Sequence, residues 1–172
     1  MFPFRIPAVG LDRHLMLQVA IVVVSSKILA GEPDTGREAL ERLIGDLPGK
    51  VVAYEVGPDD RTWIRDHLVR LCDESHPDVI LTIGGTGVRP TDWAPEATRD
   101  VIEKEVPGIG EAMRQASVKK VLTAVLSRGI AGIRKDTLII NLPGSAKAAK
   151  DNLAVVLPVL DHTVEKIKAV KR

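Results

Sequence analysis

Two hydrophobic periods alternate along the chain. Unbroken runs rich in Val and Ile are typical of strands buried on both faces, and they occur at residues 18–25, 51–56 and 78–83. Apolar residues three and four positions apart predict amphipathic helices between these strands, at residues 35–47 and 59–74. In the first helix the apolar positions are Leu40, Leu43, Ile44 and Leu47.

The alternation continues in the second half of the chain. We expect helices at 95–105, 107–120 and 145–157, and short strands at 129–134 and 137–142. Lys135-Asp136 is expected to form a tight turn between these two strands, and Pro158 to open or kink a final helix. Strands that alternate with helices predict an α/β fold, a three-layer α/β/α sandwich with a mostly parallel sheet.

We assign residues 15–172 to a single domain, since no repeat or internal linker interrupts them. Residues 1–14 mix prolines with charges and lack the shape of a secretion signal, so we interpret them as a flexible or partner-bound arm. Phe2 and Phe4 in this arm could dock on a neighbouring subunit.

Composition excludes several classes of function. The net charge is +1 and aromatic residues make up 3% of the chain, so neither a nucleic-acid surface nor an anionic-membrane surface is indicated. The single cysteine, Cys72, rules out an internal disulfide and a thiolate zinc site, which fits a cytoplasmic protein. The apolar stretch from Val19 to Val24 is too short to span a bilayer.

The candidate chemistry begins at residues 82–92, which read TIGGTGVRPTD. Gly84, Gly85 and Gly87 carry no side chain, so their backbone N–H groups can approach a ligand, and Thr86 adds a hydroxyl. No Lys-Ser/Thr pair follows the last glycine, so this is not a nucleotide P-loop, and the spacing is not that of a dinucleotide fingerprint. A phosphate-binding loop and an ordinary structural turn both fit the pattern.

Two aspartates lie near this edge of the predicted sheet. If the helix begins at Pro95, Asp92 lies outside it and is not its cap, so its carboxylate could share Mg²⁺ with a bound phosphate. Asp59 follows the second strand, where either it or Asp60 could cap the next helix. The alternatives are a solvated loop aspartate for Asp92 and a simple helix cap for Asp59.

Three loops are expected at one edge of the sheet, because ligands of such folds bind beyond the carboxyl ends of the strands. They are residues 57–59, 82–92 and 142–145.

Four ordered blocks resemble the MogA/MoaB family of molybdenum-cofactor biosynthesis. They are TIGGTGVRPTDWAPEAT, PGIGEAMR, LSRGIAGI and LIINLPGSAKAAKDNL. They occur in the family's order, and the resemblance extends over most of residues 18–162. The resemblance implies a three-layer α/β fold, a homo-oligomer that is a trimer or a hexamer, and adenylylation of molybdopterin by Mg-ATP with release of pyrophosphate.

The resemblance also implies roles for individual residues. Asp59 and Asp92 match the two essential aspartates, and we assign both to Mg²⁺ binding and alignment. The residues matched to substrate or nucleotide binding are Gly84, Gly85, Thr86, Gly87, Glu111, Ser127, Pro143, Gly144 and Ser145. Arg128 lies beside Ser127 in the same block.

The chain departs from the family pattern at three positions. Ser26 stands where the family often has Asp after the first strand, Ala94 stands where a Thr usually precedes the proline, and Ala146 stands where Pro often follows the PGS motif. Other interpretations are a binding-only or scaffold member of the same family and a nucleotide-linked hydrolase or transferase on a similar sheet. A molybdenum-insertion enzyme would need additional domains, for which 172 residues leave no room.

Overall fold

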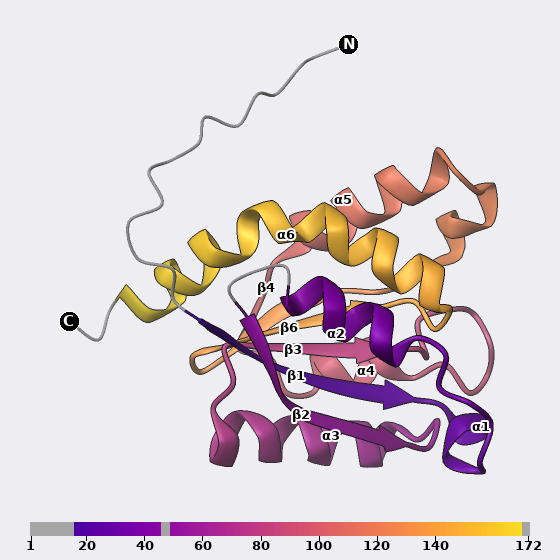
Figure 1. Cartoon of the computed structure of the whole chain (residues 1–172), viewed down its shortest axis with the longest axis horizontal. Helices are drawn as coiled ribbons and strands as arrows, with labels where there is room; N and C mark the ends of the chain where they lie inside the picture. Colours follow the sequence, from indigo (N-terminus) through magenta and orange to yellow (C-terminus); the bar gives the residue numbers. More distant parts are fainter. Residues whose placement is uncertain (1–15, 46–48, 170–172) are drawn as a thin grey trace.

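The computed structural model describes residues 16–45 and 49–169, which form a six-stranded sheet between two layers of helices (Figure 1). The strand order is β2-β1-β3-β6-β5-β4. The strands are β1 Leu17–Val24, β2 Gly49–Gly57, β3 Val79–Ile83, β4 Lys104–Glu105, β5 Ala131–Arg134 and β6 Thr137–Leu142. β2, β1, β3 and β6 are parallel, whereas β5 and β4 run antiparallel to their neighbours. The predicted mostly parallel α/β fold is confirmed.

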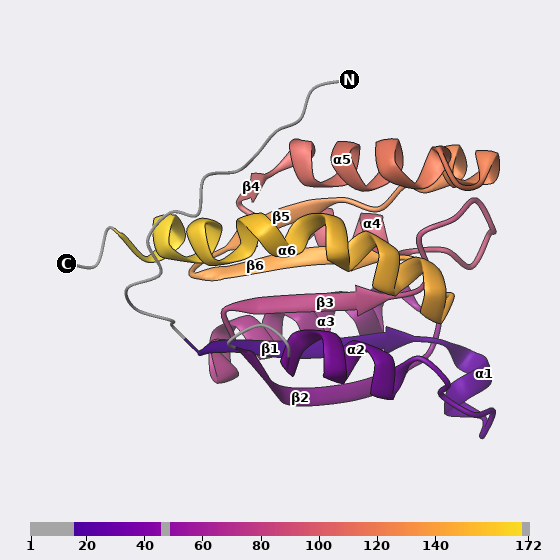
Figure 2. The same cartoon turned by 45° about the horizontal axis from the view of Figure 1, so that its top comes forward.

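The helices cover both faces of the sheet. They are α1 Ser26–Leu29, α2 Arg37–Gly45, α3 Arg61–Arg70 with a π-turn at Leu71–Ser75, α4 Ala94–Arg99, α5 Pro107–Val118, the 3₁₀-helix η2 Leu122–Leu126 and α6 Ala146–Lys168. Helices α2, α5 and α6 pack on one face, and α3 and α4 on the other (Figure 2).

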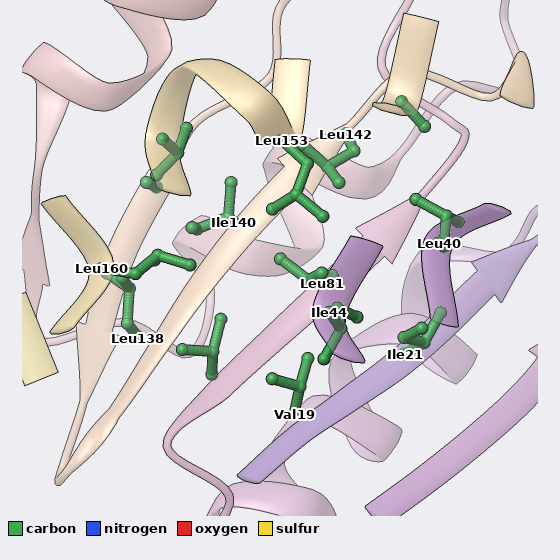
Figure 3. Packing of buried hydrophobic residues seen from close by; sticks show 14 of the residues in the cluster. Val19, Ile21, Leu40, Ile44, Leu81, Leu138, Ile140, Leu142, Leu153 and Leu160 are labelled. Atoms are coloured by element: carbon green, nitrogen blue, oxygen red, sulfur yellow. The ribbon is translucent and has the colours of Figure 1, made fainter. Parts of the chain in front are cut away.

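Alternate residues of each central strand enter different cores. Val19 and Ile21 of β1 belong to the cluster that contains Leu40 of α2 and Leu153 of α6 (Figure 3). The intervening residues, such as Val22, belong to the cluster on the α3 side. A strand buried on both faces needs apolar residues at every position, which explains the unbroken runs in the sequence.

Two helix predictions were wrong in their extent. The helix predicted at 95–105 ends at Arg99, and the chain then forms the edge strand β4, where the N–H of Val106 donates to the carbonyl of Ala131 at 2.8 Å. In contrast, α6 continues through Pro158 as one helix. Its buried residues on either side of the proline, Val156 and Leu160, keep the same face on the sheet, so packing outweighs the loss of one backbone hydrogen bond.

Other predictions have mixed outcomes. The hairpin at Lys135-Asp136 is confirmed, and Lys135 adopts a positive φ of 51° there. Cys72 is buried, and burial raises the pKa of its thiol to about 11. The proposed arm at 1–14 and Leu47 lie outside the described residues. No helix in the described part of the chain is long and apolar enough to cross a membrane.

One polar side chain interrupts the apolar central strand β6. Asn141 is 1% exposed; its amide nitrogen donates to the hydroxyls of Thr82 and Thr98, both at 2.9 Å, and its oxygen accepts from the N–H of Ile130 at 3.2 Å. This network joins β3, α4 and the segment before β5. A buried polar network of this kind stabilises one packing arrangement because every member is satisfied.

We predict that Asn141→Leu lowers the free energy of unfolding by roughly 2–4 kcal/mol, since it leaves three buried polar groups without partners. Urea denaturation measures the change. Val159→Ala, at an exposed position of α6, is the control and should change stability by less than about 0.5 kcal/mol. A loss of under about 1 kcal/mol for Asn141→Leu would show that the network does not stabilise the fold.

Candidate active site

The register of the parallel strands brings three loops to one edge of the sheet. Val24 of β1 pairs with Gly57 of β2, and Ile83 of β3 pairs with Leu142 of β6. The N–H of Gly84 donates to the carbonyl of Leu142 at 3.0 Å, which joins the glycine loop to the loop after β6. The predicted clustering of loops 57–59, 82–92 and 142–145 is confirmed.

The glycine loop, residues 84–87, begins with a residue that has no room for a side chain. Gly84 has a φ of +101°, and a Cβ there would lie 2.5 Å from the carbonyl oxygen of Val24. Gly144 packs against it, since a Cβ on Gly144 would lie 3.4 Å from the Cα of Gly84. Two predicted residues, Gly84 and Gly144, therefore let two loop backbones approach each other closely.

Asp92 lies against the other end of the glycine loop. A Cβ on Gly87 would lie 2.8 Å from Oδ2 of Asp92, so Gly87 leaves space for this carboxylate. The same oxygen accepts from the N–H of Arg89 at 2.8 Å. Helix α4 begins at Ala94, one residue before the expected Pro95, and its N-cap is Trp93, which makes no side-chain capping bond. Asp92 is therefore not a cap, as predicted.

Asp59 and Asp60 divide two tasks that the sequence left open. Oδ1 of Asp60 accepts from the N–H of Trp63 at 2.7 Å and caps α3. Asp59 is free of that role; its Oδ2 accepts from the N–H of Ser26 at 3.0 Å, and its own N–H donates to the hydroxyl of Ser26 at 3.1 Å. These two contacts with Ser26 fix the loop that carries Asp59.

A cavity of about 460 Å³ opens beside the glycine loop. Five of the predicted site residues line it: Thr86, Gly87, Ser127, Pro143 and Ser145. The other predicted residues near the loops do not line it: Gly84, Gly85, Gly144, Asp59 and Asp92. Asp92 nevertheless lies next to Gly87, which does. Glu111 is exposed on α5 and does not line the cavity, so its role stays a prediction.

The rest of the cavity lining comes from α5, η2, α6 and the turn after α5, and the sequence analysis did not predict these residues. The amide nitrogen of buried Asn152 donates to the hydroxyl of Ser117 at 3.0 Å and to the carbonyl of Ala148 at 2.8 Å. Nζ of Lys120 pairs with Oδ2 of Asp151 at 3.0 Å. Asn152 is a polar residue in the buried stripe of α6, and this break in the pattern was the available signal.

The described residues provide no ready-made metal cage. Among residues 16–45 and 49–169, no three His, Cys, Asp or Glu side chains gather closely enough to hold a metal ion. Mg²⁺ nevertheless needs one or two carboxylates when substrate phosphates supply its other oxygens. A single Asp92 carboxylate beside a phosphate-binding loop fits that requirement.

The family described as "Probable molybdopterin binding domain" matches residues 20–162 of this chain. The chain belongs to this family. The match begins within β1, ends within α6 and spans every loop of the site.

Named relatives and solved structures agree with this assignment. A molybdopterin adenylyltransferase of Helicobacter pylori is 46% identical over 66% of this chain, and the match spans 65% of that relative's length. The Escherichia coli molybdopterin adenylyltransferase is 39% identical over 80% of this chain and 72% of its own. The crystal structure of the molybdopterin biosynthesis enzyme MoaB from Thermus thermophilus has 44% identity and a TM-score of 0.85, and it covers 90% of this chain and 98% of that one.

We predict that Asp60→Ala lowers stability by about 1 kcal/mol, because the N–H of Trp63 loses its capping acceptor. Asp59→Ala should change stability by less than half of this, since its hydrogen bond to Ser26 is exposed. Thermal unfolding of the two variants makes the comparison. Equal losses would show that the two carboxylates do not divide their roles as the geometry indicates.

Proposed function

We propose that this chain catalyses the transfer of an adenylyl group from ATP to molybdopterin. The observation that carries the proposal is the contact between Gly87 and Asp92 at the rim of the cavity, which places a carboxylate beside a loop of backbone N–H groups. The names of the bacterial relatives at 39–46% identity support the same reaction.

In this reaction an oxygen of the molybdopterin phosphate attacks the α-phosphorus of ATP. A new phosphoanhydride bond forms, the bond between the α- and β-phosphates breaks, and pyrophosphate leaves. A phosphate monoester has a second pKa near 6, so the attacking group is mostly a dianion at neutral pH and needs no general base. The protein must therefore supply position and charge neutralisation rather than proton transfer.

The side chains divide this work. The N–H groups of residues 85–87 hold phosphate oxygens, since that of Gly84 is already bound to the carbonyl of Leu142. Ser127, Pro143 and Ser145, which line the cavity, bind the pterin or its phosphate. Asp92 and Asp59 are the carboxylates that would hold and align Mg²⁺, which would supply positive charge next to the phosphates. The cavity, at about 460 Å³, lies within the usual range for small-molecule sites.

We further propose that the chain works in the cytoplasm as a homo-oligomer, a trimer or a hexamer, without nucleic-acid or membrane partners. A near-neutral charge of +1 supports the absence of an anionic-polymer surface. Exposed apolar side chains on and next to η2 support self-association: Leu122 is 75% exposed, Val125 61% and Val121 54%.

We predict that Asp92→Asn lowers kcat for adenylylated molybdopterin at least about 100-fold, since a neutral amide no longer holds Mg²⁺ next to the phosphates. The assay mixes protein, molybdopterin and Mg-ATP and follows adenylylated product and pyrophosphate. The Asn side chain can still accept from the N–H of Arg89, so thermal stability should be retained. Near-normal turnover of this variant in excess Mg²⁺ would refute the assigned role.

Substitutions of Asp59 and of its neighbour Asp60 can be compared directly. Asp59→Asn should lower kcat by a similar factor, whereas Asp60→Asn keeps a capping oxygen and should retain wild-type turnover. The two variants differ by one position and by no net charge, so the same assay separates a catalytic carboxylate from a structural one. If the wild type binds molybdopterin but never releases pyrophosphate, the chain is a binding-only member of the family.

A further inference from the structure

Arg128 contacts the glycine loop from the side of its carbonyl groups. Its backbone N–H donates to the carbonyl of Thr86 at 2.8 Å. Its side-chain Nε donates to the carbonyl of Gly87 at 2.7 Å, and Nη2 donates to the carbonyl of Asp92 at 2.9 Å. One residue thus binds three carbonyl oxygens of the segment that joins the glycine loop to Asp92.

Glu96 anchors the guanidinium of Arg128. Nη1 of Arg128 donates to Oε1 of Glu96, and Nη2 lies 3.4 Å from Oε2. Burial alone would raise the pKa of Glu96, but the hydrogen bond from Arg128 keeps this pKa below its ordinary value, so the pair stays charged. The guanidinium therefore donates to the carbonyls of Gly87 and Asp92 and to both carboxylate oxygens of Glu96. These four contacts use four of its five N–H groups.

The orientation of these carbonyls fixes the orientation of the N–H groups. In a trans peptide the C=O and the next N–H point in opposite directions. Arg128 draws in the carbonyls of Thr86, Gly87 and Asp92, so the N–H groups of Gly87, Val88 and Trp93 point away from it. In the described ranges 16–45 and 49–169, no group accepts a hydrogen bond from any of these three.

Arg128 lies behind the loop and not in the cavity. Thr86, Gly87 and Ser127 line the cavity, whereas Arg128 does not, although its side chain is 37% exposed. Its charge is also committed to Glu96. Arg128 is therefore poorly placed to bind a phosphate directly, despite standing next to residues that line the site.

We propose that Arg128 is a positioning residue: its guanidinium, anchored by Glu96, turns the N–H groups of Val88 and Trp93 toward a phosphate of the bound nucleotide, and its backbone N–H turns that of Gly87. The inference rests on the proposed function for the identity of that ligand. The planar fork is needed for this role, because a single positive charge cannot bridge two carbonyls and a carboxylate.

The test compares Arg128→Lys with Arg128→Ala. Lysine keeps the charge but cannot bridge two carbonyls and a carboxylate, so both variants should weaken binding of Mg²⁺–α,β-methylene-ATP at least tenfold in calorimetry. The affinity for molybdopterin should stay within twofold of wild type. A Lys variant within threefold of wild type for the nucleotide would show that charge, not the fork, is what matters, and would overturn the proposal.

Arg134 provides a matched control elsewhere in the fold. Its guanidinium also joins a carboxylate, that of Asp73 at 2.9 Å, to a carbonyl, that of Val101 at 3.1 Å. Arg134→Lys should lower the melting temperature as much as Arg128→Lys without changing nucleotide affinity. Equal losses of nucleotide affinity in both variants would reduce Arg128 to a general structural role and overturn the proposal.

Glu96→Gln keeps the size of the Glu96 side chain and removes its charge. It tests the same interaction if the Arg128 variants fail to fold. It should weaken nucleotide binding in the same direction by a smaller factor, and unchanged binding would contradict the anchoring role. Loss of molybdopterin affinity with normal nucleotide affinity in the Arg128 variants would overturn the nucleotide assignment. Because binding is measured without turnover, a wild type that binds the analogue but forms no product refutes the proposed function alone.

Discussion

Parallel pairing of β2, β1, β3 and β6 is the constraint on which the site depends. It places the carboxyl ends of four strands at one edge, so the loops that follow β2, β3 and β6 begin beside one another. The hydrogen bond between Gly84 and Leu142 then joins two of these loops directly. Burial of the strands on both faces stabilises this arrangement, and the apolar residues of β1 supply both cores.

At this edge of the sheet, the site is formed mainly by backbone groups that lie close together. Gly84 and Gly87 are needed because Val24 and Asp92 come too near for a Cβ. Arg128 binds the carbonyl groups of Thr86 and Gly87, and the N–H groups of Gly87 and Val88 remain for a ligand. A reaction whose nucleophile is already ionised needs this kind of fixed polar surface more than it needs an acid or a base.

The strands and the loops at their ends could be predicted from the sequence because burial on both faces leaves a direct pattern of apolar residues. The sequence could not show which of Asp59 and Asp60 caps α3. Adjacent aspartates satisfy the same local rule, and only the contact with Ser26 distinguishes them. The end of α4 at Arg99 was missed because the pairing of β4 with β5 is a long-range contact.

The residues that line the cavity on α5 and α6 could not be predicted from the sequence for a related reason. Asn152 and Ser117 meet only because α5 and α6 pack side by side with a particular rotation, which spacing within either helix does not determine. The role of Arg128 likewise depends on contacts across 32 to 41 residues of chain. A motif can mark such a residue, but the direction of its bonds requires the fold.

The most direct measurement is a crystal structure of the protein with Mg²⁺ and α,β-methylene-ATP. The account predicts phosphate oxygens within hydrogen-bond distance of the N–H groups of Gly87 and Val88, with Mg²⁺ bound to the carboxylate of Asp92. Phosphates bound away from residues 84–88, or a guanidinium of Arg128 that leaves Glu96 to contact them, would contradict it.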